Sequence, residues 1–186
     1  MPSINLSFLK RLRDDYSKYT CFVETGTFWG GTIFSVEPFF NKLYTIEFSE
    51  KFYENTRRMY NGTKINFILG DSSIVFEKLL PNIDDKTIFF LDGHWSSGDT
   101  GKSAKDCPLV EEITHITNLF KNEAIIIIDD YRLFGKSAKT GHSEDWSDIN
   151  KENLLQILGN RVTDVYHLDS EHSPDDRLII HIAASL

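Results

Sequence analysis

The sequence has little of what secreted and membrane proteins need. Its two cysteines, Cys21 and Cys107, cannot build a disulfide framework, so a reducing compartment is favoured. No apolar run approaches the roughly 18–20 residues of a membrane span. The opening residues, MPSINLSFLKRLRDDY, carry charges where a signal peptide has its apolar core. These absences predict a cytoplasmic protein without a membrane span.

Positive charge is also scarce. The chain has 20 Lys and Arg against 28 Asp and Glu, and its formal net charge is −8. A surface that binds duplex nucleic acid needs clustered basic residues to replace the counterions of the phosphates. The charge therefore argues against such a surface and favours a small or neutral substrate.

Short apolar runs alternate with segments of helical periodicity along the 186 residues. Strands are predicted over residues 21–24, 43–47, 65–69, 87–91, 124–128, 162–168 and 177–183. Helices are predicted over residues 5–17, 30–40, 50–60, 72–80 and 108–120, with one more around Leu154 that ends near Gly159. Polar loops are predicted over 93–107 and 131–148.

The first five predicted strands are each followed by a helix and are too apolar to have a wet face. This pattern favours a parallel sheet that is covered on both sides. The polar turn at 169–176 is too short for a crossover, so the last two strands should pair antiparallel. The chain is therefore predicted to be one α/β domain over residues 1–186, with an N-terminal helix within 1–19 and a core over 20–186.

Carboxylates stand at the ends of all five of these strands. Ligands of open α/β sheets bind beyond the carboxyl ends of the strands, so five successive carboxylates predict a functional edge. The strand ends carry Glu24-Thr25-Gly26, Glu47, Asp71-Ser72, Asp92-Gly93-His94 and Asp129-Asp130.

The first of these strand ends, Glu24-Thr-Gly-Thr-Phe-Trp-Gly-Gly-Thr32, resembles the first motif of class I S-adenosylmethionine-dependent methyltransferases. Glu47 matches the acidic residue that binds the ribose hydroxyls in that family, and Asp71-Ser72 matches the position that contacts adenine. The resemblance covers residues 20–186. It implies a Rossmann-like, seven-stranded sheet that is mostly parallel with an antiparallel final strand and helices on both faces. It implies S-adenosyl-L-methionine as cofactor, bound by Glu24, Thr25, Gly26, Thr27, Gly30, Glu47, Phe48, Asp71, Ser72 and Asp92.

Two nucleotide-binding alternatives fit the sequence less well. A nicotinamide dinucleotide domain needs G-x-G-x-x-G, whereas Thr27 and Phe28 stand where the pyrophosphate requires glycine. The string GKSAK occurs at 101–105 and 135–139, but neither copy has the glycine that a phosphate-binding loop places six residues before the lysine. Both copies lie in the polar loops, where their lysines are candidates for holding a polar substrate.

The substrate half of the edge carries Asp92, His94, Asp129 and Asp130. One Asp after the fourth strand and two acidic residues after the fifth resemble metal-dependent O-methyltransferases, most closely the macrocin and novobiocin type that methylates sugars. The resemblance implies that Asp92, Asp129 and Asp130 bind a divalent cation, and carboxylate oxygens suit Mg²⁺. The alternative makes Asp129 a helix cap and Asp130 a solvated residue. Asp92 and His94 are the candidate catalytic residues, with either one as general base.

The prediction that follows is an O-methyltransferase that methylates a hydroxyl of a sugar or glycan with the help of a divalent cation. Three alternatives stay open. They are a catechol-like small-molecule O-methyltransferase, a non-catalytic binding module with the methyltransferase fold and, less well supported, a nicotinamide-dependent oxidoreductase. The sequence does not identify the acceptor, and it leaves a homodimer open.

Overall fold

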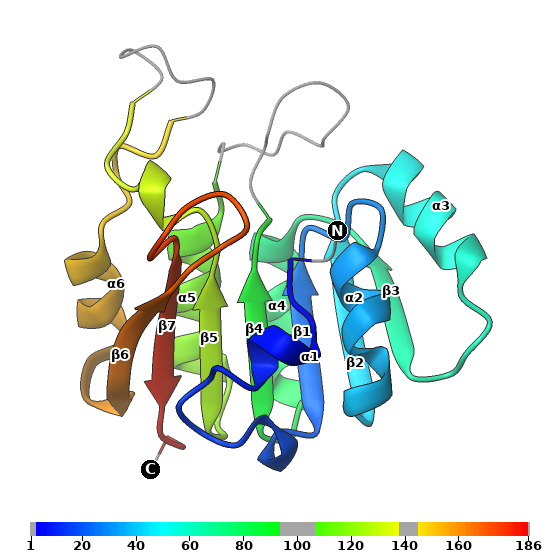
Figure 1. Cartoon of the computed structure of the whole chain (residues 1–186), viewed down its shortest axis with the longest axis horizontal. Coiled ribbons are helices and arrows are strands. Elements are labelled where there is room, and N and C mark those ends of the chain that lie inside the picture. The colour runs from blue at the N-terminus through cyan, green and yellow to red at the C-terminus, as the bar shows by residue number, and fades with distance from the viewer. Residues whose placement is uncertain (1–2, 94–106, 138–144, 186) are drawn as a thin grey trace.

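A single seven-stranded sheet forms the centre of the computed structural model, which describes residues 3–93, 107–137 and 145–185 (Figure 1). The strand order is β3-β2-β1-β4-β5-β7-β6. The strands are β1 (Cys21–Thr25), β2 (Lys42–Glu47), β3 (Ile65–Leu69), β4 (Thr87–Leu91), β5 (Ala124–Ile128), β6 (Val162–Leu168) and β7 (Arg177–Ile182). All seven predicted strands are confirmed, with bounds that agree within one residue.

Strands β1 to β5 are parallel, and their carboxyl ends are aligned. Thr25, the last residue of β1, pairs with Ile46 in β2 and with Leu91 in β4. Strand β7 runs antiparallel to both β5 and β6. The predicted antiparallel closing pair is therefore confirmed, and the residues that follow β1, β2, β4 and β5 emerge at one edge of the sheet, which we call the carboxyl edge.

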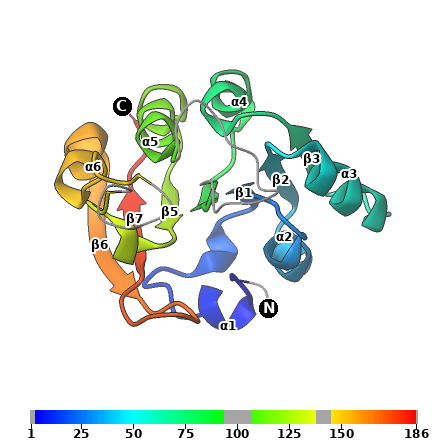
Figure 2. The same cartoon turned by 90° about the horizontal axis from the view of Figure 1, so that it is seen from above.

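Helices cover both faces of the sheet, as predicted. Figure 2 shows α4, α5 and α6 on one face and α1 and α2 on the other, with α3 beside the edge strand β3. The α-helices are α1 (Leu6–Leu9), α2 (Gly31–Val36), α3 (Glu50–Met59), α4 (Ser72–Leu79), α5 (Leu109–Leu119) and α6 (Lys151–Leu158). Short 3-10 helices are η1 (Tyr16–Lys18), η2 (Glu37–Phe39), η3 (Leu80–Asn82), η4 (Tyr131–Leu133) and η6 (Gly159–Arg161).

Strand β5 shows why both faces of the sheet must be covered by other elements. All five of its residues are buried. Ala124, Ile126 and Ile128 join the apolar cluster that includes Ile113 and Ile116 of α5. Ile125 and Ile127 join the second cluster, on the face where the N-terminal segment packs. Alternate side chains of one strand thus enter two separate cores, and this explains the continuous apolar run in the sequence.

The helix predicted over residues 5–17 is wrong. Helix α1 begins after Asn5, whose side chain accepts a hydrogen bond from the Phe8 N–H, and ends at Leu9. The Arg13 N–H donates to the Tyr166 hydroxyl of β6 at 2.9 Å, and so leaves the helical pattern. Asp15 then caps the separate turn η1 by accepting from the Ser17 N–H. A tertiary contact and a local Asp cap outweigh the amphipathic spacing of the leucines.

The helix predicted over residues 30–40 is also shorter than expected. Helix α2 begins at Gly31 and ends at Val36, and η2 continues from Glu37 to Phe39. Pro38 lies within η2, where its missing N–H and its ring prevent the α-helix from continuing. Within the described ranges, no helix has both the length and the apolar character that crossing a membrane requires.

Candidate functional site

The turn after β1 depends on two glycines in the left-handed region. Gly26 has φ +81°, and a Cβ at this position would lie 2.3 Å from the carbonyl oxygen of Asp92. Gly30 has φ +75° and occupies the N-cap position of α2. Only glycine allows the backbone after β1 to approach the backbone after β4 this closely. The turn therefore brings its backbone to the carboxyl edge at the position that the sequence predicted for a cofactor.

Glu24 lies beneath this turn and is almost completely buried, with 1% of its surface exposed. Its carboxyl accepts a hydrogen bond from the Thr45 hydroxyl at 2.7 Å, and the Thr45 and Thr27 hydroxyls lie 2.6 Å apart. Burial raises the pKa of Glu24 to about 8, although the bond from Thr45 lowers it. At neutral pH the carboxyl is mainly protonated, so Glu24 contributes a polar network rather than a negative charge.

Glu47, at the end of β2, is held by two backbone groups. Its Oε2 accepts from the Phe28 N–H and its Oε1 accepts from the Ser49 N–H, both at 2.8 Å. These bonds hold the carboxylate in one orientation and also hold Phe28 at φ +49°, which is uncommon for a residue other than glycine. Ser49 occupies the N-cap position of α3, but its side chain makes no capping bond. Phe48, beside Glu47, is exposed.

Asp71, at the end of β3, caps α4. Its Oδ1 accepts from the Ser73 N–H at 2.9 Å and from the Ser73 hydroxyl at 2.6 Å. Ser72 is the first residue of α4 and is buried. The strand-end acid of the predicted adenine position thus has a helix-capping role of its own.

Asp92 follows β4 and faces the other carboxylates of the edge. Its N–H donates to the carbonyl oxygen of Thr25 at 3.2 Å and to the Thr25 hydroxyl at 3.3 Å. Burial raises the pKa of Asp92 well above its usual range, and the charges of Asp129 and Asp130 raise it further, whereas Arg177 lowers it. The predicted base His94 lies outside the described residues, as does the GKSAK copy at 101–105.

Asp129 and Asp130, after β5, each contact an arginine. The Arg177 guanidinium donates to Oδ1 of Asp129 at 3.2 Å, and the Asp130 N–H donates to the same oxygen at 3.1 Å. Asp130 has φ +58° and pairs with Arg132. Burial raises the pKa of Asp129, and the charge of Arg177 opposes that rise. Asp130 occupies the N-cap position of η4, but its side chain makes no capping bond.

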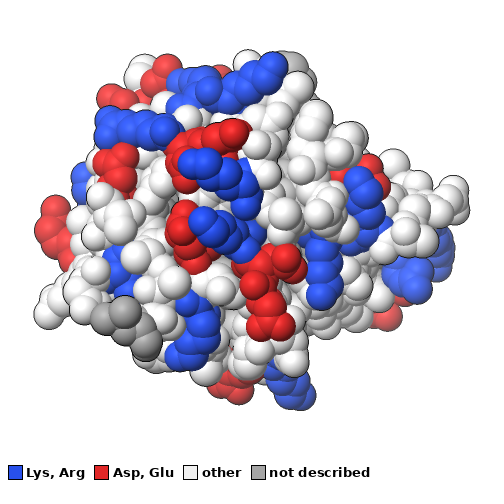
Figure 3. Space-filling view, turned by 90° about the horizontal axis from the view of Figure 1, so that it is seen from below, with Lys and Arg blue, Asp and Glu red and all other residues white. Residues whose placement is uncertain are grey.

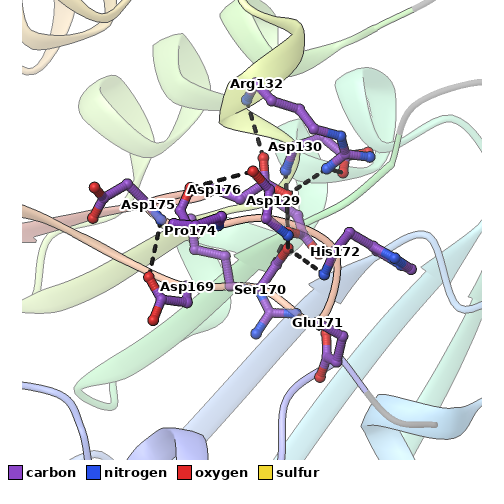
Figure 4. Close-up of polar contacts among 12 residues, drawn as sticks. Asp129, Asp130, Arg132, Asp169, Ser170, Glu171, His172, Pro174, Asp175 and Asp176 are labelled. Atoms are coloured by element: carbon purple, nitrogen blue, oxygen red, sulfur yellow. Dashed lines mark hydrogen bonds and ion pairs between the residues drawn. The ribbon is translucent and has the colours of Figure 1, made fainter.

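Asp176 completes this group from the loop between β6 and β7 (Figure 4). Its Oδ1 accepts from the Arg132 N–H at 3.0 Å, and its Oδ2 accepts from the Ser170 hydroxyl at 2.7 Å and from the Arg132 guanidinium. These bonds lower the pKa of Asp176 against the opposing effect of burial. Asp129, Asp130 and Asp176 offer carboxylate oxygens that all lie within 4.8 Å of one another. The sequence predicted Asp92 as the third member of this acidic group. Among the residues that the structure describes, the third member is Asp176 instead.

Comparison with known proteins shows which fold the chain has. No protein-family model and no curated protein matches the chain. Solved structures match. The O-methyltransferase TomG from Streptomyces achromogenes, in complex with S-adenosylmethionine, aligns with a TM-score of 0.62 at 15% identity over 91% of this chain and 75% of its own. The N-methyltransferase NodS from Bradyrhizobium japonicum aligns with a TM-score of 0.57 at 11% identity over 97% and 94%.

The chain has the class I methyltransferase fold. A third match is an rRNA methylase from Streptococcus thermophilus, with a TM-score of 0.52 at 15% identity over 91% of this chain and 89% of its own. These three structures are named for methyl transfer to oxygen, to nitrogen and to ribosomal RNA. The fold alone therefore does not select the acceptor, which depends on the residues grafted onto it.

The methyltransferase fold brings most of the predicted site residues to one edge. Glu24, Glu47, Asp71, Asp92 and the Asp129-Asp130 pair all lie at or just beyond the ends of parallel strands. Sequence reasoning missed Asp176, Arg132 and Arg177, which lie around Asp129 and Asp130. The available signal was weak: a charged pair that opens the apolar last strand, and an arginine two residues after Asp130.

Proposed function

We propose that the protein is an S-adenosylmethionine-dependent O-methyltransferase that methylates a hydroxyl of a sugar or glycan with the help of a divalent cation. The arrangement of the Gly26 turn and Glu47 carries the cofactor assignment. A glycine turn brings the backbone to the edge of the sheet, and one strand away two backbone N–H groups hold a carboxylate in place. The likeness to methyltransferase structures supports the same assignment.

Each predicted cofactor residue has a proposed task at its strand end. Glu47 and Phe48 bind the ribose, and Asp71 and Ser72 lie at the adenine end. The remaining residues shape the pocket for the aminoacyl end of the cofactor; they are Glu24, Thr25, Gly26, Thr27, Gly30 and Asp92. Because Glu24 is mainly neutral at pH 7, it acts through the Thr45 and Thr27 hydroxyls and not as a counter-charge.

The chemistry is an in-line transfer. S-adenosylmethionine, when bound, supplies an electrophilic methyl group on its sulfonium. Transfer would join the acceptor oxygen to the methyl carbon and break the carbon–sulfur bond, whose electron pair would stay on sulfur. The hydroxyl proton leaves to a base, for which Asp92 and His94 are the candidates. The chain contributes mainly by holding the acceptor oxygen in line with the methyl group.

Asp129 and Asp130, together with Asp176, have carboxylate oxygens close enough to share a divalent cation. Asp129 accepts from Arg177 and from the Asp130 N–H through Oδ1, whereas both oxygens of Asp176 already accept from protein donors. We therefore assign the cation to Asp92, Asp129 and Asp130, with Asp176 as the anchor of Arg132. Burial raises the pKa values of Asp92 and Asp129, and the charge of Asp130 raises both further, so a bound cation would favour their charged forms. Such a cation lowers the pKa of a hydroxyl that it binds.

Ligand-induced stabilisation tests the cofactor assignment. S-adenosylhomocysteine at about 100 times its dissociation constant should stabilise the fold by about 2.7 kcal/mol. For a chain of this size that corresponds to a rise in unfolding temperature of roughly 5–11 °C. NAD⁺ at the same concentration should leave the temperature unchanged. Stabilisation by NAD⁺ and not by S-adenosylhomocysteine would overturn the proposal.

Chelation tests the cation and the acceptor class. EDTA should abolish transfer of a labelled methyl group to sugars or glycans while S-adenosylhomocysteine still binds. Asp130→Asn should raise the Mg²⁺ concentration needed for half-maximal transfer, and Asp92→Asn should reduce transfer more strongly. Full activity in EDTA would exclude a divalent cation from the proposed reaction. Methyl transfer to catechols but not to sugars would replace the proposed sugar acceptor by a catechol. Binding of S-adenosylhomocysteine without methyl transfer to any acceptor would indicate a non-catalytic module. The cytoplasmic location and a homodimer stay predictions.

A further inference from the structure

Glu112 is a buried acid that no step above uses. It lies in the first turn of α5 and has 1% of its surface exposed. Its Oε1 has no hydrogen-bond partner among the residues that the structure describes. A buried carboxyl with an unpaired oxygen destabilises a fold relative to an apolar side chain of similar size. Packing alone therefore gives no reason for a glutamate at this position.

The surroundings of Glu112 are three segments of the proposed cofactor cleft. Burial raises the pKa of Glu112 to about 7, whereas the hydroxyls of Thr25, at the end of β1, and of Ser72, at the start of α4, lower it. A Cβ on Gly93, just after β4, would lie 3.3 Å from Oε1 of Glu112. One side chain thus meets the ends of two strands and the start of a helix.

Thr25 links Glu112 to Asp92. The Thr25 hydroxyl has one proton, and the Asp92 N–H donates to its oxygen. When the hydroxyl gives its proton to Glu112, its lone pairs are free to accept from Asp92. A carboxyl at Glu112 therefore selects the hydroxyl orientation that binds the backbone of Asp92. The Thr25 hydroxyl thus stands between the Asp92 N–H, which donates to it, and the carboxyl of Glu112, whose pKa it lowers.

The backbone around Thr25 and Asp92 leaves little free space. A Cβ on Gly93 would lie 3.0 Å from the Thr25 hydroxyl, and one on Gly26 would lie 2.3 Å from the Asp92 carbonyl oxygen. Asp92, Gly93 and Glu112 line a cavity of about 10 Å³, which is at the lower limit of the space that holds one water molecule. The turn at Asp92 has little room to shift as long as Glu112 and Thr25 hold it.

We propose that Glu112 is a positioning residue for cofactor binding, which acts through the hydroxyls of Thr25 and Ser72 to hold the turn at Asp92 and the start of α4. This inference rests on the proposed function. It assigns to α5 a direct part in the cleft, which otherwise is built from strand ends and from α4. Glu112 itself touches no cofactor; it sets the positions of residues that do.

Two substitutions of Glu112 separate positioning from folding. Glu112→Gln keeps the size and an acceptor oxygen for the hydroxyls, and Glu112→Leu keeps the size but removes both acceptors. We expect Glu112→Leu to weaken S-adenosylhomocysteine binding by at least about tenfold in calorimetry, and Glu112→Gln by less than about threefold. The unfolding temperature of ligand-free Glu112→Leu should not fall, because the substitution removes a buried unpaired oxygen.

Two further variants complete the experiment. Glu152→Leu, an exposed glutamate in the first turn of α6, is the matched control and should bind the ligand like the wild type. In a Thr25→Val background, Glu112→Leu should add little, because the hydroxyl through which it acts is already gone. This inference is overturned if Glu112→Leu binds S-adenosylhomocysteine as tightly as the wild type, or if it loses affinity only to the extent that it unfolds. Either result leaves the proposed function intact. If the wild type does not bind S-adenosylhomocysteine, the proposed function fails, and this inference fails with it.

Discussion

The two edges of the sheet hold some of their acidic side chains in contrasting surroundings. At the amino edge, each of two neighbouring carboxylates has a lysine partner: Asp14 with Lys18 at 2.7 Å and Glu123 with Lys86 at 2.8 Å. Figure 3, which looks at this side of the molecule from below, shows basic and acidic side chains interleaved across the surface. At the carboxyl edge, Glu24 is buried with a hydroxyl as its partner.

The pKa values follow this difference. The hydrogen bond from Lys18 lowers the pKa of Asp14, whereas burial raises the pKa values of Glu24, Asp92 and Glu112. A carboxylate with a nearby cation stabilises the fold, and a buried carboxylate without one destabilises it at neutral pH. Retaining several such destabilising groups at one edge is typical of a functional site. The comparison therefore indicates that the amino edge supports the fold, and it agrees with the proposal that the carboxyl edge carries the chemistry.

Arg161 gives the sharpest test of the amino edge. Its buried guanidinium donates to the backbone carbonyls at the end of α5 and nearby, those of Ile116, Thr117, Phe120, Asn122 and Ala183. Arg161→Leu should cost about 4 kcal/mol, because it leaves buried carbonyls without donors. The unfolding temperature should fall by roughly 8–16 °C, measured by calorimetry.

Ligand binding is the control for Arg161. The folded fraction of Arg161→Leu should bind S-adenosylhomocysteine like the wild type, because the residue lies at the opposite edge from the cleft. Arg161→Lys keeps the charge but loses the planar fork of donors, so its effect should be intermediate. An unchanged unfolding temperature for Arg161→Leu would contradict the structural role of this edge.

The pH dependence of folding stability in Glu24→Gln tests the carboxyl edge. The folded pKa of about 8 lies above the unfolded value of 4.5, so between these values the folded protein holds a proton that the unfolded chain has lost. Stability should therefore fall as the pH rises through this window, by on the order of 3 kcal/mol from this group. Glu24→Gln should flatten that slope in urea denaturation curves recorded at several pH values, and the part due to Glu112 should remain.

Asp14 supplies the opposite control at the amino edge. Its folded pKa is lowered, so its contribution is present at neutral pH and is lost as the pH falls below about 4. Asp14→Asn should remove this acid-side loss and leave the slope between pH 5 and 8 intact. An equal slope in Glu24→Gln and the wild type would show that Glu24 is not desolvated.

Glu47→Ala should act on the cofactor and much less on the fold. If Glu47 hydrogen-bonds two ribose hydroxyls as proposed, removing its carboxylate should weaken S-adenosylhomocysteine binding by about 1.5–3 kcal/mol in calorimetry. Glu123→Ala, which removes a carboxylate from the amino edge, is the matched control and should leave the affinity unchanged. Equal affinities in the two variants would exclude Glu47 from the cofactor site.

Lys86→Ala should have the smallest effect. The ion pair with Glu123 joins side chains that are 46% and 37% exposed. Exposed pairs are screened by solvent and salt, so the loss should be at most about 0.5 kcal/mol. Urea denaturation at low and high salt measures it, and the difference from the wild type should shrink at high salt. A loss of several kcal/mol would mean that the amino edge depends on individual ion pairs.

Local pattern predicted the strands well and the N-terminal segment badly. The run Ala124–Ile128 has one stable solution, burial on both faces, so its place in a covered sheet follows from composition. Residues 5–17 have helical spacing, but the Arg13 N–H bonds to Tyr166, a residue 153 positions along the chain. A pattern over a few residues contains no information about a partner so far away.

The candidate site divides in the same way. Strand-end acids and the Gly26 turn are readable from the sequence, because parallel strands bring their carboxyl ends to one edge. The partners of those acids are not. Asp176 lies 44 residues from Arg132, and Glu112 appears in the sequence as an ordinary acid in the first turn of a helix, where the helix dipole favours it.

The sequence by itself thus determined the class of fold, the edge proposed to bind ligands and the acids that stand there, because these follow from periodicity and from the rule that ligands bind at strand ends. Tertiary structure alone decided the state of each acid: neutral beside Thr45 for Glu24, bonded to Arg132 for Asp176, unpaired beneath Gly93 for Glu112. The physical reason is that charge depends on burial and on the nearest donor, and both are set by segments that meet only in the folded chain.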